Sequence, residues 1–208
     1  MNVLIADDHK IVRMGLSLIL SEEFPGVSIT EAGNAAAVLK ALRNKKFDMM
    51  LMDLRMPDTD SIDLLENALD NDPALKILVV SFNPERIFAL RCLKSGAYGY
   101  IEKNCDDTLF RKAMKKVAAG KKYMSDDVVE LMADHLKNGK SSDPFSILSK
   151  NEFLVAMHFI NGLGNTEICD IMNLQSSTVA TYKTRLFEKI NVKNVHELGQ
   201  LAAQYKIS

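Results

Sequence analysis

The feature that most constrains the fold is an alternation, over the first 120 residues, of short apolar runs with segments of helical periodicity. Between the runs, apolar residues recur every three or four positions, as on one buried face of a helix. Strands alternating with helices form βαβ units, and continuous apolar strands suit a parallel sheet covered on both faces. The pattern predicts an α/β domain with a doubly wound, five-stranded parallel sheet. Its strands are expected at residues 3–6, 27–30, 49–52, 77–80 and 97–101.

A second pattern begins near residue 145 and has no strand-like alternation. Its apolar spacing predicts a smaller all-α domain of four helices, at residues 150–160, 166–172, 178–190 and 195–205. Between the two patterns, residues 128–136 predict one more helix, and the Gly, Ser and Pro of residues 138–144 are typical of flexible chain. We therefore expect one domain at 1–120, a linker with a helix at 121–144, and a second domain at 145–208.

Composition and charge exclude several classes of protein. Hydrophobic residues make up 47% of the chain and charged residues 25%, which excludes a disordered or fibrous chain. The apolar runs are too short to span a bilayer, and acidic residues interrupt the N-terminus, so we expect a cytoplasmic protein without a membrane partner. Because the net charge is −1, any binding of nucleic acid has to depend on local features.

Polar side chains follow four of the five predicted strands. Asp7 and Asp8 come after the first strand, and Asp53, Ser81 and Lys103 come after the third, fourth and fifth. Ligands of open parallel sheets bind at the carboxyl ends of the strands, so these side chains are expected to converge. Neighbouring carboxylates repel each other unless a cation neutralises them, and oxygen ligands suit Mg²⁺. A carboxylate in such a site can attack a phosphoryl group, while a lysine and a hydroxyl hold its oxygens.

Four segments carry a resemblance to a known family. They are LIADD (4–8), LMDLRMP (51–57), VVSF (79–82) and GAYGYIEK (96–103), and they resemble the receiver domain of two-component response regulators, the CheY-like fold. The resemblance implies that Asp53 accepts the phosphoryl group. It implies that Mg²⁺ is bound by Asp7, Asp8, Asp53 and the backbone carbonyl of Arg55.

The same resemblance implies a conformational switch. In it, Ser81 is the switch hydroxyl, Lys103 contacts the phosphate, and Tyr100 is the aromatic residue that rotates. The chain departs from the family at two positions: Ser61 replaces a glycine that usually begins the third helix, and Asn104 replaces the proline that often follows the lysine. A cis peptide without proline is costly, so no cis peptide is claimed at Asn104.

The C-terminal domain contains two short predicted helices joined by a tight turn at residues 173–175. Ser176 or Ser177 is expected to cap the second helix. Two helices joined in this way, the second polar and basic, form a helix-turn-helix arrangement, although a surface helix of a small bundle would give the same pattern. Residues 176–189 carry three basic side chains and one acidic one.

Here too the sequence resembles a family. The segments LSKNE (148–152), GLGNTEI (162–168) and SSTVATYKTRLFEKINV (176–192) are similar to the LuxR-type helix-turn-helix, and the whole architecture resembles NarL/FixJ response regulators. The resemblance implies that the second helix enters the major groove and that helix 195–205 dimerises. Departures occur at Ala180, usually lysine, and Tyr182, usually histidine. The candidate DNA contacts are Ser177, Thr178, Ala180, Thr181, Lys183, Thr184, Arg185 and Lys189.

These observations predict a phosphorylation-dependent transcription regulator and not an enzyme. A sensor histidine kinase or a small phosphodonor would supply the phosphoryl group, and the protein would bind double-stranded DNA as a homodimer, with RNA polymerase as a further candidate partner. Three alternatives stay open: an enzyme with an aspartyl-phosphate intermediate, an interaction module that binds protein, and a DNA-binding protein that ignores phosphate. The enzyme would need a second acid, but Arg55 stands two residues after Asp53.

Overall fold

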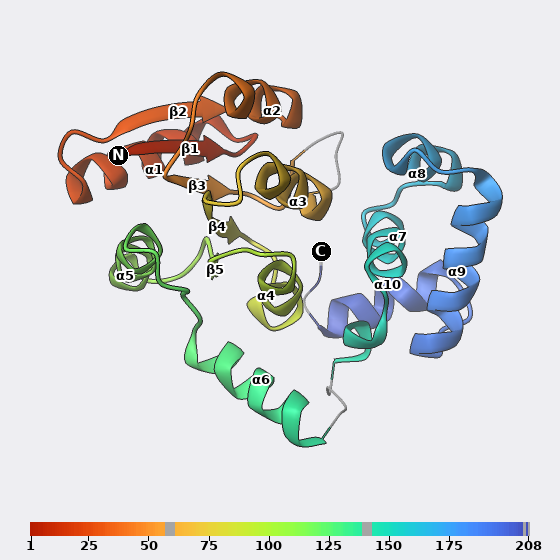
Figure 1. Ribbon diagram of the computed structural model, residues 1–208. Helices are drawn as coiled ribbons and strands as arrows, with labels where there is room; N and C mark the ends of the chain where they lie inside the picture. Colours follow the sequence, from red (N-terminus) through yellow and green to blue (C-terminus); the bar gives the residue numbers. More distant parts are fainter. Residues whose placement is uncertain (57–60, 139–142, 206, 208) are drawn as a thin grey trace. The chain divides into compact units, whose positions relative to one another are not determined.

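The computed structural model describes residues 1–56, 61–138, 143–205 and 207, apart from the side chains of 131 and 134–138. The chain forms two compact units, Met1–Val129 and Glu130–Ser208 (Figure 1). The division falls within a helix, α6 (Asp126–Asn138), which is longer than the predicted 128–136. Pro57 of the LMDLRMP segment and most of the predicted flexible stretch, residues 139–142, lie outside the described residues.

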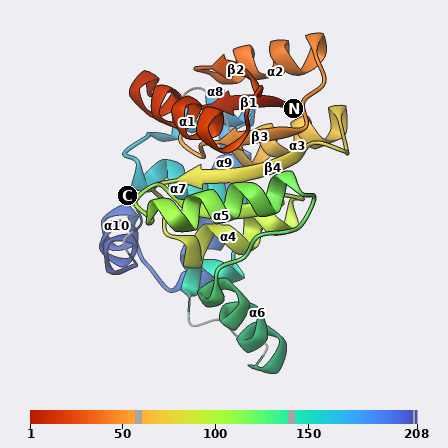
Figure 2. The same ribbon diagram turned by 90° about the vertical axis from the view of Figure 1, so that its left-hand side faces the viewer.

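The first unit contains the predicted parallel sheet. Its strand order is β2-β1-β3-β4-β5, and every neighbouring pair is parallel, which confirms the doubly wound fold. Helices α1 and α5 cover one face and α2, α3 and α4 the other (Figures 1 and 2). The strands are β1 (Asn2–Ala6), β2 (Ser28–Ala32), β3 (Met49–Met52), β4 (Lys76–Ser81) and β5 (Gly99–Glu102). The helices are α1 (Lys10–Glu23), α2 (Ala35–Asn44), α3 (Ser61–Asn71), α4 (Glu85–Lys94) and α5 (Asp107–Ala118).

Side chains before the helices explain where several of them begin. Asn34 accepts a hydrogen bond from the backbone N–H of Ala37 (2.8 Å), and Asp106 accepts one from that of Thr108 (2.8 Å), as N-cap residues do. Pro84 occupies the N-cap position of α4 and makes no side-chain capping bond. The central strands are buried on both faces, so the polar residues that follow them are held at one edge of a rigid sheet.

The chain leaves the receiver-like unit by pairing once more with its sheet. The N–H of Tyr123 donates to the carbonyl of Tyr98 (2.7 Å), and Tyr123 forms a parallel bridge with Gly99. An added Cβ at Gly99 would lie 3.0 Å from Cβ of Tyr123, so the close approach needs glycine. Tyr123 is 3% exposed and belongs to the core between the sheet, α1 and α5, although it follows the predicted end of this domain at residue 120.

The second unit is helical, as predicted. Beyond α6, its described residues form a short 3₁₀ helix, η1, and four α-helices, whose buried residues include Val179 and Leu186. Asn173 adopts a left-handed conformation (φ 50°, ψ 47°) in the turn between α8 and α9, which asparagine tolerates well. The elements are η1 (Pro144–Ile147), α7 (Lys150–Ile160), α8 (Asn165–Met172), α9 (Ser176–Ile190) and α10 (Val195–Gln204).

The expected serine cap of α9 is wrong. The helix begins at Ser176 itself, and Gln175 stands at the N-cap without a side-chain capping bond in the described structure. The helix therefore starts two residues earlier than the predicted 178. Among the described helices, none combines the length and the apolar character that crossing a bilayer requires.

Candidate functional site

The candidate site lies at the carboxyl ends of β1, β3 and β5. The ammonium group of Lys103 donates to Oδ2 of Asp7 (2.6 Å) and to Oδ2 of Asp53 (2.7 Å). Register explains the meeting, because Ala6 pairs with Met52, so the aspartates that follow them leave neighbouring strands at the same level. The side chains of Lys103, Asp7 and Asp53 are only 5%, 1% and 2% exposed, so these ion pairs are shielded from water.

The aspartates form an acidic cluster at this edge of the sheet. Asp7, Asp8, His9 and Asp53 each offer a ligand atom, and these atoms lie within 4.8 Å of one another. Nδ1 of His9 lies 2.7 Å from Oδ1 of Asp8. His9 is the N-cap residue of α1, and its N–H donates to Oδ1 of Asp7 (2.8 Å). This hydrogen bond connects the start of α1 to the acidic cluster.

The residues of the cluster fit a divalent cation. Oδ1 of Asp53 is buried and has no hydrogen-bond partner among the described residues, which is costly for a carboxylate oxygen. Lys103 brings one positive charge to three carboxylates, so negative charge remains in excess. Carboxylate oxygens in this arrangement suit Mg²⁺. Arg55 follows β3, and its side chain donates through Nη2 to Oδ1 of Asn83 (3.3 Å).

The candidate switch residues meet at Asn83. Ser81 is fully buried, and its Oγ accepts from the N–H of Asn83 (3.3 Å). Tyr100 is 1% exposed, and its hydroxyl donates to the carbonyl of Asn83 (2.8 Å). Burial raises the pKa of Tyr100 well above its usual value, so the hydroxyl stays protonated and remains a donor. Asn83 was not among the switch residues expected from the sequence, because its contacts to Ser81 and Tyr100 are made by backbone groups that almost any residue carries.

The two departures in this unit have local consequences. Ser61 is the first residue of α3, and its hydroxyl donates to the carbonyl of Leu54, which ties the helix start to the end of β3. No cis peptide occurs in the described chain, and Asn104 follows Lys103 in a trans bond.

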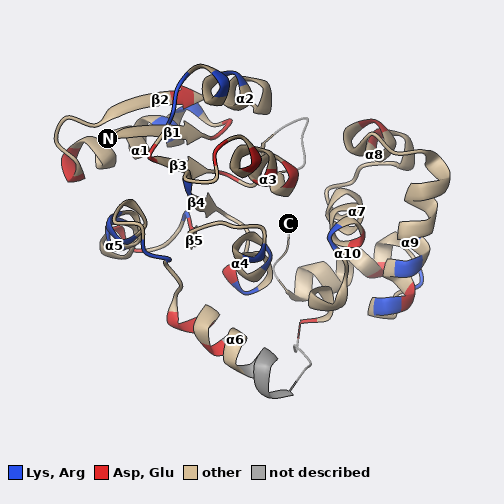
Figure 3. Ribbon diagram, in the orientation of Figure 1, with Lys and Arg blue, Asp and Glu red and all other residues tan. Residues whose placement is uncertain are grey.

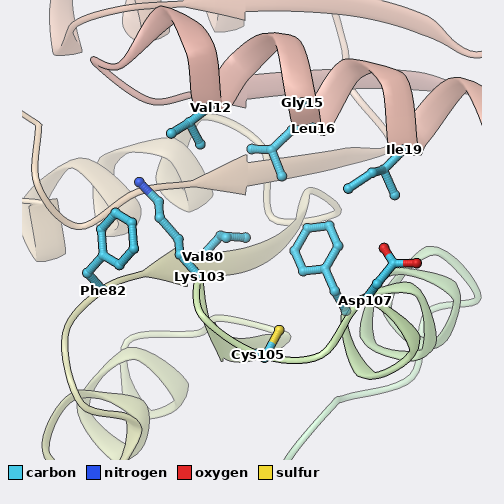
Figure 4. A pocket seen from close by; sticks show the side chains of 10 residues that line it. Val12, Gly15, Leu16, Ile19, Val80, Phe82, Lys103, Cys105 and Asp107 are labelled. Carbon is cyan, nitrogen blue, oxygen red and sulfur yellow. The ribbon is translucent and has the colours of Figure 1, made fainter.

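An apolar hollow of about 290 Å³ lies beside the lysine, between α1 and α5 (Figure 4). Its walls include Val12 and Leu16 of α1, and the ring of Phe82, whose centroid is 5.1 Å from the Lys103 ammonium. The stem of Lys103 also lines this wall. Apolar surroundings strengthen the ion pairs of the ammonium group, since less water competes for it.

The predicted DNA-contacting residues lie on α9. Some of them are exposed, and others contact side chains of their own domain. Ser177, Ala180, Thr181, Thr184 and Arg185 are exposed, and Thr178 is half-buried. Two of the three cations contact their own domain. The ammonium group of Lys183 lies 4.9 Å from the ring centroid of Phe159, and that of Lys189 donates to Oε2 of Glu152 (2.7 Å).

The pair of Lys189 and Glu152 is partly structural. Glu152 is nearly buried, and burial alone would raise the pKa of its carboxyl. Hydrogen bonds from Lys189 and Ser149 outweigh burial and hold the pKa below its usual value. Ser149 and Glu152 also form a capping box at the start of α7. A phosphate that bound Lys189 would have to compete with this carboxylate.

Comparison with known families covers both units. The family model of the response regulator receiver domain matches residues 3–115, and that of the bacterial regulatory proteins of the luxR family matches residues 146–202.

Relatives match over nearly the whole chain. The oxygen regulatory protein NreC of Staphylococcus epidermidis is 32% identical, over 100% of this chain and 99% of its own. The virulence regulator BvgA of Bordetella pertussis is 34% identical, over 99% and 98%. The response regulator UvrY of Escherichia coli is 29% identical, over 98% and 94%.

A solved structure is also similar over its full length. RcsB of Salmonella enterica serovar Typhimurium, bound to promoter rprA with a phosphomimetic beryllofluoride, gives a TM-score of 0.80 at 26% identity, over 98% of both chains. The chain therefore belongs to the response regulators of the NarL/FixJ type, which join a receiver domain to a LuxR-type DNA-binding domain.

Proposed function

We propose that this protein is a transcription regulator whose DNA binding is controlled by phosphorylation of Asp53. The observation that carries the proposal is the bridge from Lys103 to both Asp7 and Asp53, which leaves Oδ1 of Asp53 unpartnered. Residues 1–120 act as the receiver, 121–144 as the linker and 145–208 as the DNA-binding domain. A regulator that reads chromosomal DNA works in the cytoplasm.

The chemical step is a transfer of one phosphoryl group. A carboxylate oxygen of Asp53 attacks the phosphorus of a phosphohistidine in a sensor kinase, or of a small acyl phosphate, and forms an acyl phosphate. The bond from phosphorus to the donor breaks, and the donor keeps that electron pair. Lys103 donates to a phosphoryl oxygen. Asp7, Asp8, Asp53 and the Arg55 carbonyl would hold Mg²⁺, which when bound neutralises charge on the phosphoryl oxygens.

The output is a shift between two conformations. The phosphoryl group adds strong acceptor oxygens close to Ser81, whose hydroxyl turns toward them. Asn83 contacts both Ser81 and Tyr100, and the Tyr100 side chain also interacts directly with Ser81, so movement of the serine reaches the buried tyrosine. The favoured conformation dimerises, with α10 as part of the contact, and the dimer binds two DNA half-sites about one helical turn apart. RNA polymerase is a further partner.

This protein is not proposed to act as a phosphatase on other substrates. Such an enzyme needs a second acid near the nucleophile, and the residue two positions after Asp53 is Arg55, whose guanidinium donates to Asn83.

The test is DNA binding with and without the phosphorylated state. Purified full-length protein is mixed with fragments of its own genome, alone or with Mg²⁺ and beryllofluoride, and Asp53→Asn serves as the variant that cannot form the mimic. We expect tighter, selective binding with the mimic for the natural chain only. Equal binding in all conditions would contradict phosphorylation control, and an absence of selective binding would favour a domain that binds protein.

A further inference from the structure

The outward face of α9 is built from small side chains. Ser177, Ala180, Thr181 and Thr184 are exposed, and each lies three or four residues from two of the others, so they share one face of the helix. Val179, Leu186 and Ile190 are buried on the other side. The first charged residue of the helix is Lys183, and Figure 3 shows the first turns of α9 without charge.

The threonine hydroxyls on this face are turned to the helix itself. Oγ1 of Thr181 donates to the carbonyl of Ser177 (2.8 Å), and Oγ1 of Thr184 donates to the carbonyl of Ala180 (3.1 Å). Threonine has two branches at Cβ, so a hydroxyl bonded to the preceding turn leaves the methyl branch to face outward. Together with Ala180 beside them, Thr181 and Thr184 give the helix a patch of methyl groups.

Two of the three cations of α9 are engaged within their own domain, and so are poorly placed for the base reading that is commonest in the major groove. Arginine or lysine usually reads guanine. Here Lys183 packs over Phe159 and Lys189 is paired with Glu152, which leaves the exposed Arg185 at the flank of the face. Alanine and threonine methyls, in contrast, pack against the C5-methyl group of thymine.

We infer that α9 selects its DNA by contact with thymine methyl groups, through Ala180, Thr181 and Thr184. The inference rests on the proposed DNA-binding function and adds the feature of DNA that is read. Lysine at position 180, the residue usual in the family, would place a charged chain on this patch, so Ala180 is a determinant of specificity.

Uracil provides the probe, because it is thymine without the C5-methyl group and keeps the same hydrogen-bonding groups. Full-length protein with Mg²⁺ and beryllofluoride first enriches sequences from a random duplex pool. Each enriched duplex is then compared with a copy in which thymines are replaced by uracil, either within the protected region or only in the flanks. Burying one methylene-sized group is worth a factor of about four in Kd, which is the loss expected for each contacted methyl.

Matched variants separate the methyl groups from the hydroxyls. Thr181→Ser and Thr184→Ser remove the methyl and keep the hydroxyl, and the double variant is expected to prefer thymine over uracil duplexes only by the factor of about four that Ala180 supplies. Thr181→Val and Thr184→Val keep a methyl and remove the hydroxyl, and are expected to retain the preference. Thr166→Ser, the same change on the exposed first turn of α8, is the control.

Three results would overturn the inference. The natural chain could bind thymine and uracil duplexes equally; the valine variants, and not the serine variants, could lose the preference; or uracil in the flanks alone could have the full effect. In each case DNA binding, and with it the proposed function, would stand. A pool that yields no enriched sequence would instead contradict the proposed function, and the inference with it.

Discussion

The receiver site and α9 place their polar side chains in opposite ways. In the receiver, Lys103 reaches from the end of one strand to carboxylates at the ends of two others, and all three side chains are buried. On α9, Lys183 and Lys189 contact their own domain, and the hydroxyls of Thr181 and Thr184 bond to carbonyls of their own helix. Buried charged groups suit the transfer of a charged phosphoryl group. An exposed surface whose polar groups are already hydrogen-bonded suits recognition by apolar contact.

Replacement of the central carboxylate tests the first half of this comparison and has the largest expected effect. Asp53→Ala should abolish incorporation of a phosphoryl group from a radiolabelled donor, because the nucleophile is gone. Asp127→Ala, which removes an exposed carboxylate from α6, should label like the natural chain. Persistent labelling of the Asp53 variant would place the acceptor elsewhere.

Among these variants, removal of the Lys103 ammonium group should lower the free energy of unfolding the most. Lys103→Met leaves the buried carboxylates of Asp7 and Asp53 without their partner, and breaking such a pair costs about 3 to 5 kcal/mol. Urea unfolding with EDTA should show this loss, and Mg²⁺ should recover part of it. Lys46 is 75% exposed and pairs with Asp72 (3.1 Å), so Lys46→Met should cost less than about 1 kcal/mol. If both lysine variants lost the same free energy of unfolding, burial of the ion pair would not determine its contribution.

On α9 the comparison is between two neighbouring cations. Lys189→Met leaves the nearly buried carboxylate of Glu152 unpaired, and should lower the free energy of unfolding by about 2 kcal/mol. Arg185→Met should change stability by less than about 0.5 kcal/mol but weaken DNA binding and reduce its dependence on salt. Urea denaturation and DNA titrations on both variants measure these effects. If Lys189→Met weakened DNA binding and Arg185→Met lowered stability, Lys189 would be the phosphate contact.

The smallest expected effect depends on pH. Burial raises the pKa of Glu85 from 4.5 to about 7, and Glu102 lies close, with its Oε1 accepting from the Glu85 N–H (2.8 Å). The protonated form is favoured on folding, so its contribution to stability is complete below about pH 4.5 and is lost as the pH rises through 7.

Glu85→Gln should therefore stabilise the protein at pH 8 by roughly 1 kcal/mol, after discounting for the solvent-exposed part of the side chain. At pH 4.5 it should have little effect. Thermal unfolding at both pH values measures the difference, and Glu130→Gln, an exposed glutamate of α6, is the control. A benefit of the same size at both pH values would show that the charge of Glu85 is not its cause.

The sheet and the convergence of the receiver site could be predicted because topology alone brings strand ends together. Asp7, Asp53 and Lys103 were expected at one edge, and they lie within hydrogen-bond distance there. The connection made by Asn83 could not be predicted, because it depends on backbone groups whose direction is set by the loop.

For α9, the sequence pattern was less informative. It placed eight candidate contacts on α9 but could not tell which side chains point to solvent. The partner of Lys189 is Glu152, on another helix, and the hydroxyl of Thr184 donates to the carbonyl of Ala180, one turn earlier. Both outcomes follow from rotamers and packing, which spacing does not reveal.

The bridge between Gly99 and Tyr123 has a consequence for the edge of the sheet. β5 is an edge strand, and unpaired backbone groups on an edge can add strands from other molecules. Tyr123 satisfies the Tyr98 carbonyl and covers core side chains, so the start of the linker shields this edge. A receiver fragment cut at residue 120 would lose that protection and tend to self-associate through β5, whereas a fragment that ends after Val129 would keep it.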